Sequence, residues 1–165
     1  MPKSKPLPTQ QELHELFDYS VVTGQLYWKK PFSSRIKAGD VAGTFDRYTF
    51  IRIRHQRHAA HRLIWVWVTG EDPGAMDIDH INGDKTCNAW HNLRLATKSQ
   101  NMRNTKVCKG YYFNKNRVTP WHARITTDQG VIHLGYFRTE SEAAAAYKEA
   151  SLKYHGEFSR YTVSR

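Results

Sequence analysis

An acidic residue and a histidine stand side by side in the segment Asp79-His80-Ile81-Asn82-Gly83-Asp84, and two asparagines follow it. Asn92 lies twelve residues beyond His80, and Asn101 lies nine residues beyond Asn92. The Asn-Gly-Asp turn can reverse the chain, so that a hairpin and a helix would bring both asparagines back to the pair. Hydrolysis of a phosphodiester needs a nucleophilic water, a base and a cation that neutralises the developing charge. These residues suit that chemistry.

Each of these side chains has a role that fits its type. Asp79 offers a carboxylate to a hard divalent ion, and His80, with an unperturbed pKa of about 6.5, can accept a proton near neutral pH. The side-chain carbonyl of Asn92 can hold the other ring nitrogen and fix the tautomer. Thr97 can cap a helix in which Asn101 lies one turn in, facing back toward the carboxylate. Two protein oxygens leave positions for phosphate and water, as Mg²⁺ prefers.

The composition favours a polyanionic partner. Lys and Arg number 25 against 15 Asp and Glu, a net charge of +10, which points to nucleic acid.

Cys87 and Cys108 have neither zinc-site spacing nor the density of a disulfide scaffold, so we expect a cytoplasmic protein with no structural zinc. The apolar run 63–68 is too short to span a bilayer, and the first residues lack a signal-peptide pattern. We expect no membrane association, and a monomer or weak dimer.

Local patterns predict a β-rich region ahead of the Asp-His pair. Residues 1–8 are rich in Pro and Lys, and we expect them to be disordered. Thr9–Glu12 resemble a capping box that opens a helix. Apolar and basic residues alternate over 49–54, which indicates a half-buried strand. Residues 60–69 indicate a short helix that ends at Gly70. Together with the Asp-His segment they form one predicted domain, residues 9–105.

A second domain is predicted over residues 106–165. The pattern indicates three strands and one helix, at 111–113, 121–126, 131–137 and 140–154. Thr139 and Glu142 form a capping box at the start of the helix. Residues 106–138 carry six Lys or Arg against one Asp. A small basic sheet packed on a helix can enter the major groove of DNA.

The segment from about Trp65 to Asn104 resembles the HNH nuclease family, with its motif over 76–104. The matching stretches are Asp79 to Lys85, Asn92 to Thr97 and Ser99 to Asn104. The closest variant is the H-N-N form of phage-encoded homing endonucleases, in which an Asn replaces the last His. The resemblance implies a ββα-metal fold, Asp79 and Asn101 as ligands of Mg²⁺ or Mn²⁺, His80 as general base, and Asn92 as the residue that orients it.

Two further groups of residues are expected to contact DNA. Arg94, Lys98 and Arg103 lie near enough in sequence to brace its backbone. Residues from about Lys109 to Thr162 resemble the Apetala-two/ethylene-response-factor DNA-binding domain, which has a three-stranded sheet and a packing helix. From the resemblance and from residue chemistry, the expected contacts in this domain are Lys109, Tyr112, Asn114, Lys115, Arg117, Arg124, Thr126 and His133.

The sequence therefore predicts an α+β protein with a ββα-metal nuclease core, a small β-rich N-terminal region, and a three-stranded antiparallel sheet packed on one helix. We expect it to nick or cut double-stranded DNA as a phage-type homing endonuclease in the bacterial cytoplasm. One alternative is a catalytically inactive DNA-binding regulator. Another is a nuclease or binding partner directed at RNA, in which aromatic residues on the sheet stack on bases.

Overall fold

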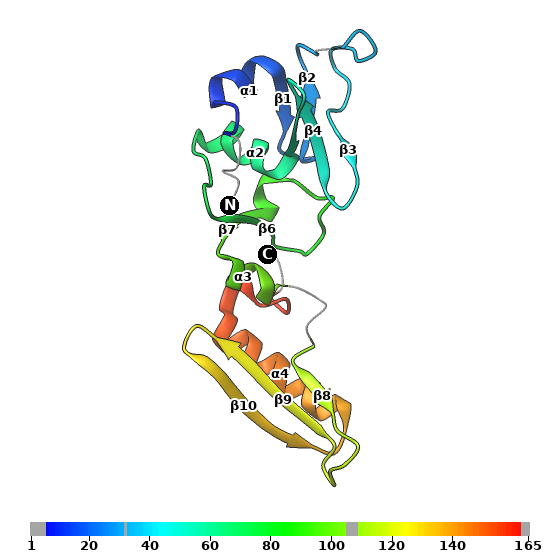
Figure 1. Cartoon of the computed structure of the whole chain (residues 1–165), viewed down its shortest axis with the longest axis vertical. Helices are drawn as coiled ribbons and strands as arrows, with labels where there is room; N and C mark the ends of the chain where they lie inside the picture. The colour runs from blue at the N-terminus through cyan, green and yellow to red at the C-terminus, as the bar shows by residue number, and fades with distance from the viewer. Residues whose placement is uncertain (1–5, 32, 105–108, 163–165) are drawn as a thin grey trace. The chain divides into compact units, whose positions relative to one another are not determined.

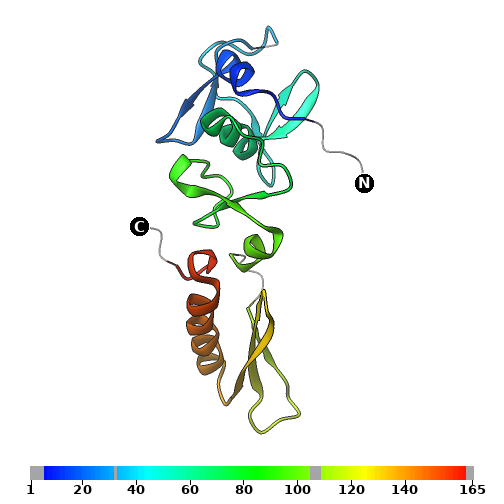
Figure 2. The same ribbon diagram turned by 90° about the vertical axis from the view of Figure 1, so that its left-hand side faces the viewer.

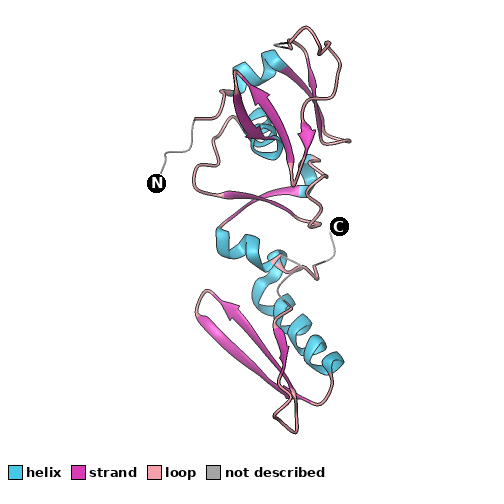
Figure 3. Cartoon of the chain, turned by 45° about the vertical axis from the view of Figure 1, so that its right-hand side comes forward, coloured by secondary structure: helices cyan, strands magenta, loops and turns pink. Residues whose placement is uncertain are grey.

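The computed structural model describes residues 6–31, 33–104 and 109–162. The chain divides into two compact units, residues 1–97 and 98–165. Helices and strands are mixed in both units, and the strands pair into several small antiparallel sheets (Figures 1 and 3). Among the described residues, no helix combines the length and the apolar character that crossing a bilayer requires.

The first unit is built from short elements. They are α1 (Gln10–Leu16), β1 (Phe17–Ser20), β2 (Gln25–Trp28), β3 (Thr44–Phe45), β4 (Thr49–Ile53), β5 (Gln56–Ala59), α2 (Ala60–Thr69), β6 (Asp77–His80), the 3-10 turn η1 (Trp90–Asn92) and β7 (Leu93–Ala96). Strand β1 pairs with β2, β4 lies between β3 and β5, and β6 pairs with β7. Both helix signals are confirmed: Thr9 forms a capping box with Glu12, and Gly70 ends α2 in a left-handed conformation.

The core of the first unit lies between its two helices and the small sheets. Leu13 of α1 and Leu63 and Ile64 of α2 are fully buried in it. The rings of Trp65 and Trp90 lie 5.0 Å apart, which ties α2 to the turn before β7. Tryptophan packing therefore links the β6–β7 hairpin to α2.

The second unit is a three-stranded sheet and a long helix. Its elements are α3 (Lys98–Arg103), β8 (Tyr111–Phe113), β9 (Trp121–Thr127), β10 (Gly130–Phe137), α4 (Glu140–His155) and the 3-10 turn η2 (Gly156–Phe158). Strand β9 is central, and α4 packs along one face of the sheet (Figure 2). The structure thus has the sheet-and-helix arrangement that the sequence predicts. Helix α3, which follows the β6–β7 hairpin in sequence, belongs to this unit.

The buried face of α4 differs in part from the expected one. The helical period of the sequence predicts one packing stripe made of Ala143, Ala146, Tyr147, Ala150 and Tyr154. Tyr154, however, is 41% exposed. The stripe instead continues through Ser151 and His155, four and eight residues beyond the buried Tyr147. The prediction was wrong because it favoured an aromatic ring over small and polar residues. Here the polar ones are buried with partners: Ser151 Oγ lies 2.8 Å from Ser159 Oγ, and His155 Nε2 lies 3.0 Å from the Thr126 carbonyl.

Candidate active site

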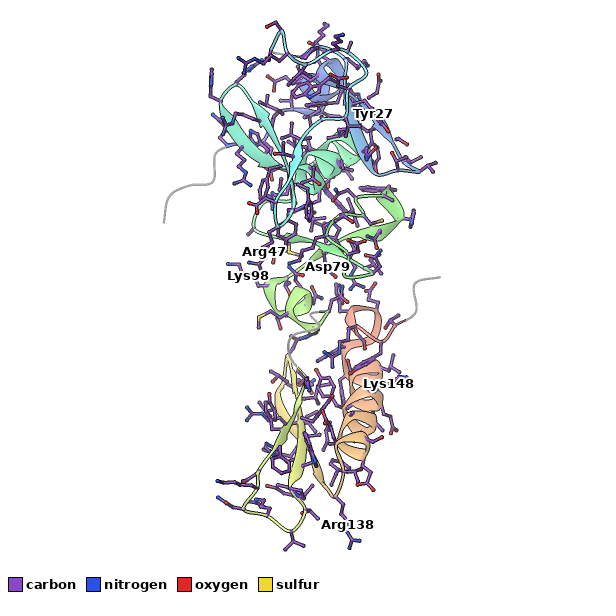
Figure 4. All side chains as sticks on the ribbon, turned by 90° about the vertical axis from the view of Figure 1, so that its right-hand side faces the viewer. Tyr27, Arg47, Asp79, Lys98, Arg138 and Lys148 are labelled. Carbon is purple, nitrogen blue, oxygen red and sulfur yellow. The ribbon has the colours of Figure 1, made fainter. Side chains whose placement is uncertain are left out.

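The Asp-His pair lies on β6, which pairs with β7 so that Asp79 stands opposite Arg94 and His80 opposite Leu93. Asp79 and His80 are each only 4% exposed as whole residues. Successive residues of a strand face opposite sides, and here Asp79 meets β7 while His80 meets the loop that follows β6. Figure 4 marks Asp79 in the first unit.

The imidazole of His80 is held by Asn88. His80 Nε2 lies 2.9 Å from Asn88 Oδ1. An amide oxygen only accepts hydrogen bonds, so Nε2 carries the proton and the lone pair lies on Nδ1. Burial lowers the pKa of His80, while the hydrogen bond that its ring donates to Asn88 and the charges of Asp79 and Asp84 oppose that shift. The ring is therefore neutral near pH 7 and able to accept a proton.

Asn92 has a different role from the expected one. The sequence assigns to it the hydrogen bond that orients His80, but that bond belongs to Asn88. The Asn92 amide instead spans the loop: Oδ1 accepts from the Asn82 backbone N–H at 3.0 Å, and Nδ2 donates to the Cys87 carbonyl at 2.7 Å. Spacing along the sequence could not decide which of the two asparagines, Asn88 or Asn92, bonds to His80. Asn92 braces the loop that carries the histidine's partner.

The backbone of Asn88 is positioned by the N-terminal hairpin. The hydroxyl of Tyr19 donates to the Asn88 carbonyl at 3.0 Å, and burial raises the pKa of Tyr19 to about 12, so that the phenol keeps this proton. Gly24, in the turn between β1 and β2, has a φ of +70°, and a Cβ there would overlap the backbone of Asn88 and Ala89. The hairpin and the loop therefore pack backbone to backbone.

Asp79 is paired with Arg94. Its Oδ2 accepts from Arg94 Nε at 2.9 Å and from Nη2 at 2.7 Å. The two side chains are 5% and 12% exposed, so this is a buried ion pair. Arg94 is among the residues expected to brace DNA, and the structure engages it with the carboxylate instead. Asp79 therefore already holds one cationic group at the position expected of a metal ligand.

Two aromatic residues that the sequence did not assign to the site surround His80. The ring of His61, at the start of α2, lies 5.3 Å from it, in edge-to-face orientation. Tyr48 lies 5.2 Å from His61 and 6.2 Å from His80. Burial, with the nearby charges of His80 and Arg62, lowers the pKa of His61 to about 3. His61 is therefore a neutral ring in this cluster.

The expected metal ligands fall in different units. Asp79 lies in the first unit, and Asn101 lies on α3 of the second. Within the described residues, no group of three or more His, Cys, Asp or Glu side chains is placed to hold a metal ion. A carboxylate and an amide oxygen would suit a hard cation whose other ligands are phosphate and water. The donor types of Asp79 and Asn101 therefore fit Mg²⁺.

The residues of the second unit expected to contact DNA have several environments. Lys98 is exposed on α3, whereas Arg103 forms an ion pair with Asp128. Lys109 pairs with Glu140 at 3.3 Å. The exposed face of the sheet and the β8–β9 connection carry the others: Tyr112, Asn114, Lys115, Arg117, Arg124, Thr126 and His133.

Across that face the side chains form a stacked row, defined as Arg124, Tyr112, His122, Tyr136 and Arg117. Arg124 lies over Tyr112 at 5.2 Å and Arg117 lies over Tyr136 at 4.5 Å. Between them the Tyr112 and His122 rings are 5.2 Å apart and stacked, and those of His122 and Tyr136 are 6.1 Å apart. The row places a guanidinium at each end.

His122 and Tyr136 were not among the residues expected on this surface. The alternation of a strand could have predicted the position of His122, because it lies two residues before Arg124 on β9 and so faces the same side of the sheet. Tyr136 follows His133 by an odd number of positions and would face the helix in a regular strand. A β-bulge between His133 and Gly135 shifts the register, so that Tyr136 stands opposite His122. Period-two reasoning fails at a bulge.

Comparison with known proteins places the site within a known domain. Residues 58–103 match the family model described as HNH endonuclease, and this segment contains Asp79, His80, Asn92 and Asn101. It ends before β8. The matched segment of the chain is therefore an HNH endonuclease domain.

A relative extends the likeness beyond that domain. Protein 3.8 of Escherichia phage T7 is 31% identical over 108 residues, which are 61% of this chain and 88% of the phage protein. The chain belongs to the family of this phage protein. No solved structure matches the chain.

Proposed function

We propose that the protein is a divalent-metal-dependent endonuclease that hydrolyses phosphodiester bonds of double-stranded DNA. The observation that carries this proposal is the state of His80 within the HNH domain: buried, neutral, and held through Nε2 by Asn88 at 2.9 Å. In this tautomer Nδ1 carries the lone pair that would accept a proton from water. Asp79 would supply a carboxylate ligand to Mg²⁺ or Mn²⁺, and Asn92 keeps the loop in place. The bound ion would neutralise charge that develops on the phosphate.

We also propose that the second unit binds the DNA through the open face of its sheet. The stacked row supports this, because each terminal arginine lies over a ring and keeps its hydrogen-bonding edge for phosphates or guanine. Tyr112 stacks on His122, and the two arginines lie over Tyr112 and Tyr136. Fewer ring faces are therefore open to unpaired bases, which favours a duplex as the ligand. Lys115 and Asn114 lie on the exposed β8–β9 connection beside the row. Within the family we propose a phage-type homing role, with this unit setting the target.

A plasmid-nicking assay tests the enzymatic proposal. The wild-type protein should nick supercoiled DNA with Mg²⁺ and not with EDTA. His80→Ala should lower the rate by about 10²- to 10⁴-fold, as expected for the loss of a general base, while DNA affinity stays unchanged. His91→Ala is the matched control, because His91 is an exposed histidine of the same motif. Equal rates for wild type and His80→Ala would contradict the proposal.

One observation favours a second candidate, a DNA-binding regulator without catalytic activity. The carboxylate of Asp79 is engaged by Arg94 in a buried pair, and in a scaffold that pair would serve folding alone. The two candidates differ in the same assay: the regulator binds the plasmid but leaves it supercoiled at every Mg²⁺ or Mn²⁺ concentration. Mapping the cleaved ends of a randomised library then tests the homing role, which requires cuts confined to a defined site.

A further inference from the structure

A lysine lies next to the candidate base on the loop after β6. Thr86 bonds to the Asp84 carboxylate through its backbone N–H at 2.9 Å and its hydroxyl at 2.7 Å, which braces the turn around Lys85. The half-buried Lys85 side chain places Nζ 4.7 Å from the centre of the Tyr48 ring. Tyr48 in turn lies against the rings of His61 and His80. The ammonium group therefore belongs to the aromatic cluster around the histidine.

Lys85 differs from Arg94 and Arg103 in its partners. Those arginines are paired with Asp79 and Asp128. In the part of the chain that the structure describes, no ion pair involves Lys85. Lys85 instead contacts the face of the Tyr48 ring, which attracts a cation without neutralising its charge. A half-buried ammonium beside a proton acceptor is thus available to an anion.

From these contacts we propose that Lys85 binds a non-bridging oxygen of the scissile phosphate, and that Tyr48 is the positioning residue that holds it there. This inference rests on the proposed endonuclease function. Water attacks phosphorus and forms a new P–O bond while His80 accepts the water proton. The bond to the leaving oxygen breaks, its electron pair leaves with that oxygen, and solvent supplies a proton. Lys85 keeps its protons and offsets the charge that grows on the phosphate oxygens.

Tyr48 lies outside residues 58–103, the segment that matches the HNH family. It stands in the turn between β3 and β4, next to Arg47, which Figure 4 labels. The N-terminal sheet would therefore supply part of the active site as well as part of the core. The ring of Tyr48, rather than its hydroxyl, makes the contact with the lysine, so a phenylalanine can replace it.

The first test replaces the lysine. With Mg²⁺ and a nicked-plasmid readout, Lys85→Gln should lower kcat by about 10²-fold with KM within about threefold, since the contact strengthens in the transition state. Lys85→Arg should recover to within about tenfold of wild type. Lys37→Gln is the charge-matched control, an exposed lysine of the same unit. Far-UV circular dichroism checks that each variant is folded.

The outcomes separate this inference from the function on which it rests. An inert wild-type protein would overturn both. If the wild type cleaves and Lys85→Gln cleaves equally well, the role of Lys85 alone is overturned. A higher KM with unchanged kcat would make Lys85 an ordinary DNA contact and would also overturn its role at the reacting phosphate.

The second test isolates the positioning residue. Tyr48→Phe should keep kcat within about twofold, whereas Tyr48→Leu should lower it by about fivefold, because the cation–π contact that holds Lys85 is lost. Because Tyr48 acts through Lys85, the double variant with Leu at 48 and Gln at 85 should be no slower than Lys85→Gln alone. Additive losses, or a Tyr48→Phe variant as slow as Tyr48→Leu, would overturn the positioning role.

Discussion

In the first unit the guanidinium of Arg94 is held by the buried carboxylate of Asp79, whereas in the second unit those of Arg117 and Arg124 lie over tyrosine rings on an exposed face. A carboxylate neutralises an arginine and saturates part of its hydrogen-bonding edge. A ring orients the arginine and leaves both its charge and that edge to a ligand. The difference indicates that the first unit uses its polar contacts to fix a site, and the second presents them to a partner.

The largest effect that would sharpen this contrast is on stability. Arg94→Ala should destabilise the first unit by about 3–5 kcal/mol, because it leaves the Asp79 carboxylate buried without its partner. Urea unfolding followed by tryptophan fluorescence measures this, since four of the five tryptophans, Trp28, Trp65, Trp67 and Trp90, lie in that unit. Arg124→Ala, the matched exposed arginine, should change stability by less than about 0.5 kcal/mol. Equal losses would remove the contrast.

The second-largest expected effect is that of Asn88→Ala on the rate of DNA nicking. Asn88→Ala removes the acceptor that holds Nε2 of His80, and the nicking rate should fall by about 10²-fold, in the range for a partner that fixes a histidine. His91→Ala is again the control, because His91 is an exposed residue of the same segment. Single-turnover nicking of the two variants decides the point. An unaffected Asn88→Ala would assign the orienting role elsewhere.

Acid should destabilise the first unit through His61. Its pKa is about 3 in the fold and about 6.5 when unfolded, so the unfolded chain binds the proton first. Stability is full above pH 6.5 and is lost as the pH falls toward 3, by roughly 2 kcal/mol between pH 7 and pH 5. His61→Phe should flatten that part of the pH dependence of the urea midpoint. The same slope in both proteins would show that other groups carry it.

The smallest predicted effect tests the open face of the second unit. Arg124→Ala should weaken binding to duplex DNA by about tenfold, near the lower end for an arginine contact with a base or phosphate. Lys148→Ala is the control on α4, on the other side of the sheet, and Figure 4 labels this lysine. Fluorescence anisotropy at fixed salt measures both. If Lys148→Ala weakens binding as much as Arg124→Ala, the binding surface is misplaced.

Local signals were sufficient for much of the fold. Capping residues and glycine stops carry their meaning within a few positions, which is why α1, α2 and α4 begin and end close to the predicted residues. The strands β1 and β2 escaped prediction, because Phe17–Ser20 and Gln25–Trp28 are too short for a clear alternation. Their pairing is fixed instead by contacts with the rest of the unit.

The candidate site was less accessible to sequence reasoning. The motif gave Asp79 and His80, but the partner of a histidine depends on which of two loop asparagines faces it, and spacing does not encode that direction. Tyr48 and His61 reach the site from other elements, so their roles exist only in the folded chain. The expected DNA contacts of Arg94 and Arg103 illustrate the same limit, because their acidic partners are fifteen and twenty-five residues away.

Gly24 shows how far the nuclease segment depends on what precedes it. Because any side chain at this position would overlap the backbone at Asn88 and Ala89, the close approach of hairpin and loop requires a glycine. A cassette of residues 58–103 moved into another protein would lose that support, together with the Tyr19 hydroxyl. The HNH domain of this chain therefore depends on residues outside its motif, and a fragment meant to keep the geometry of the candidate site has to include the first hairpin.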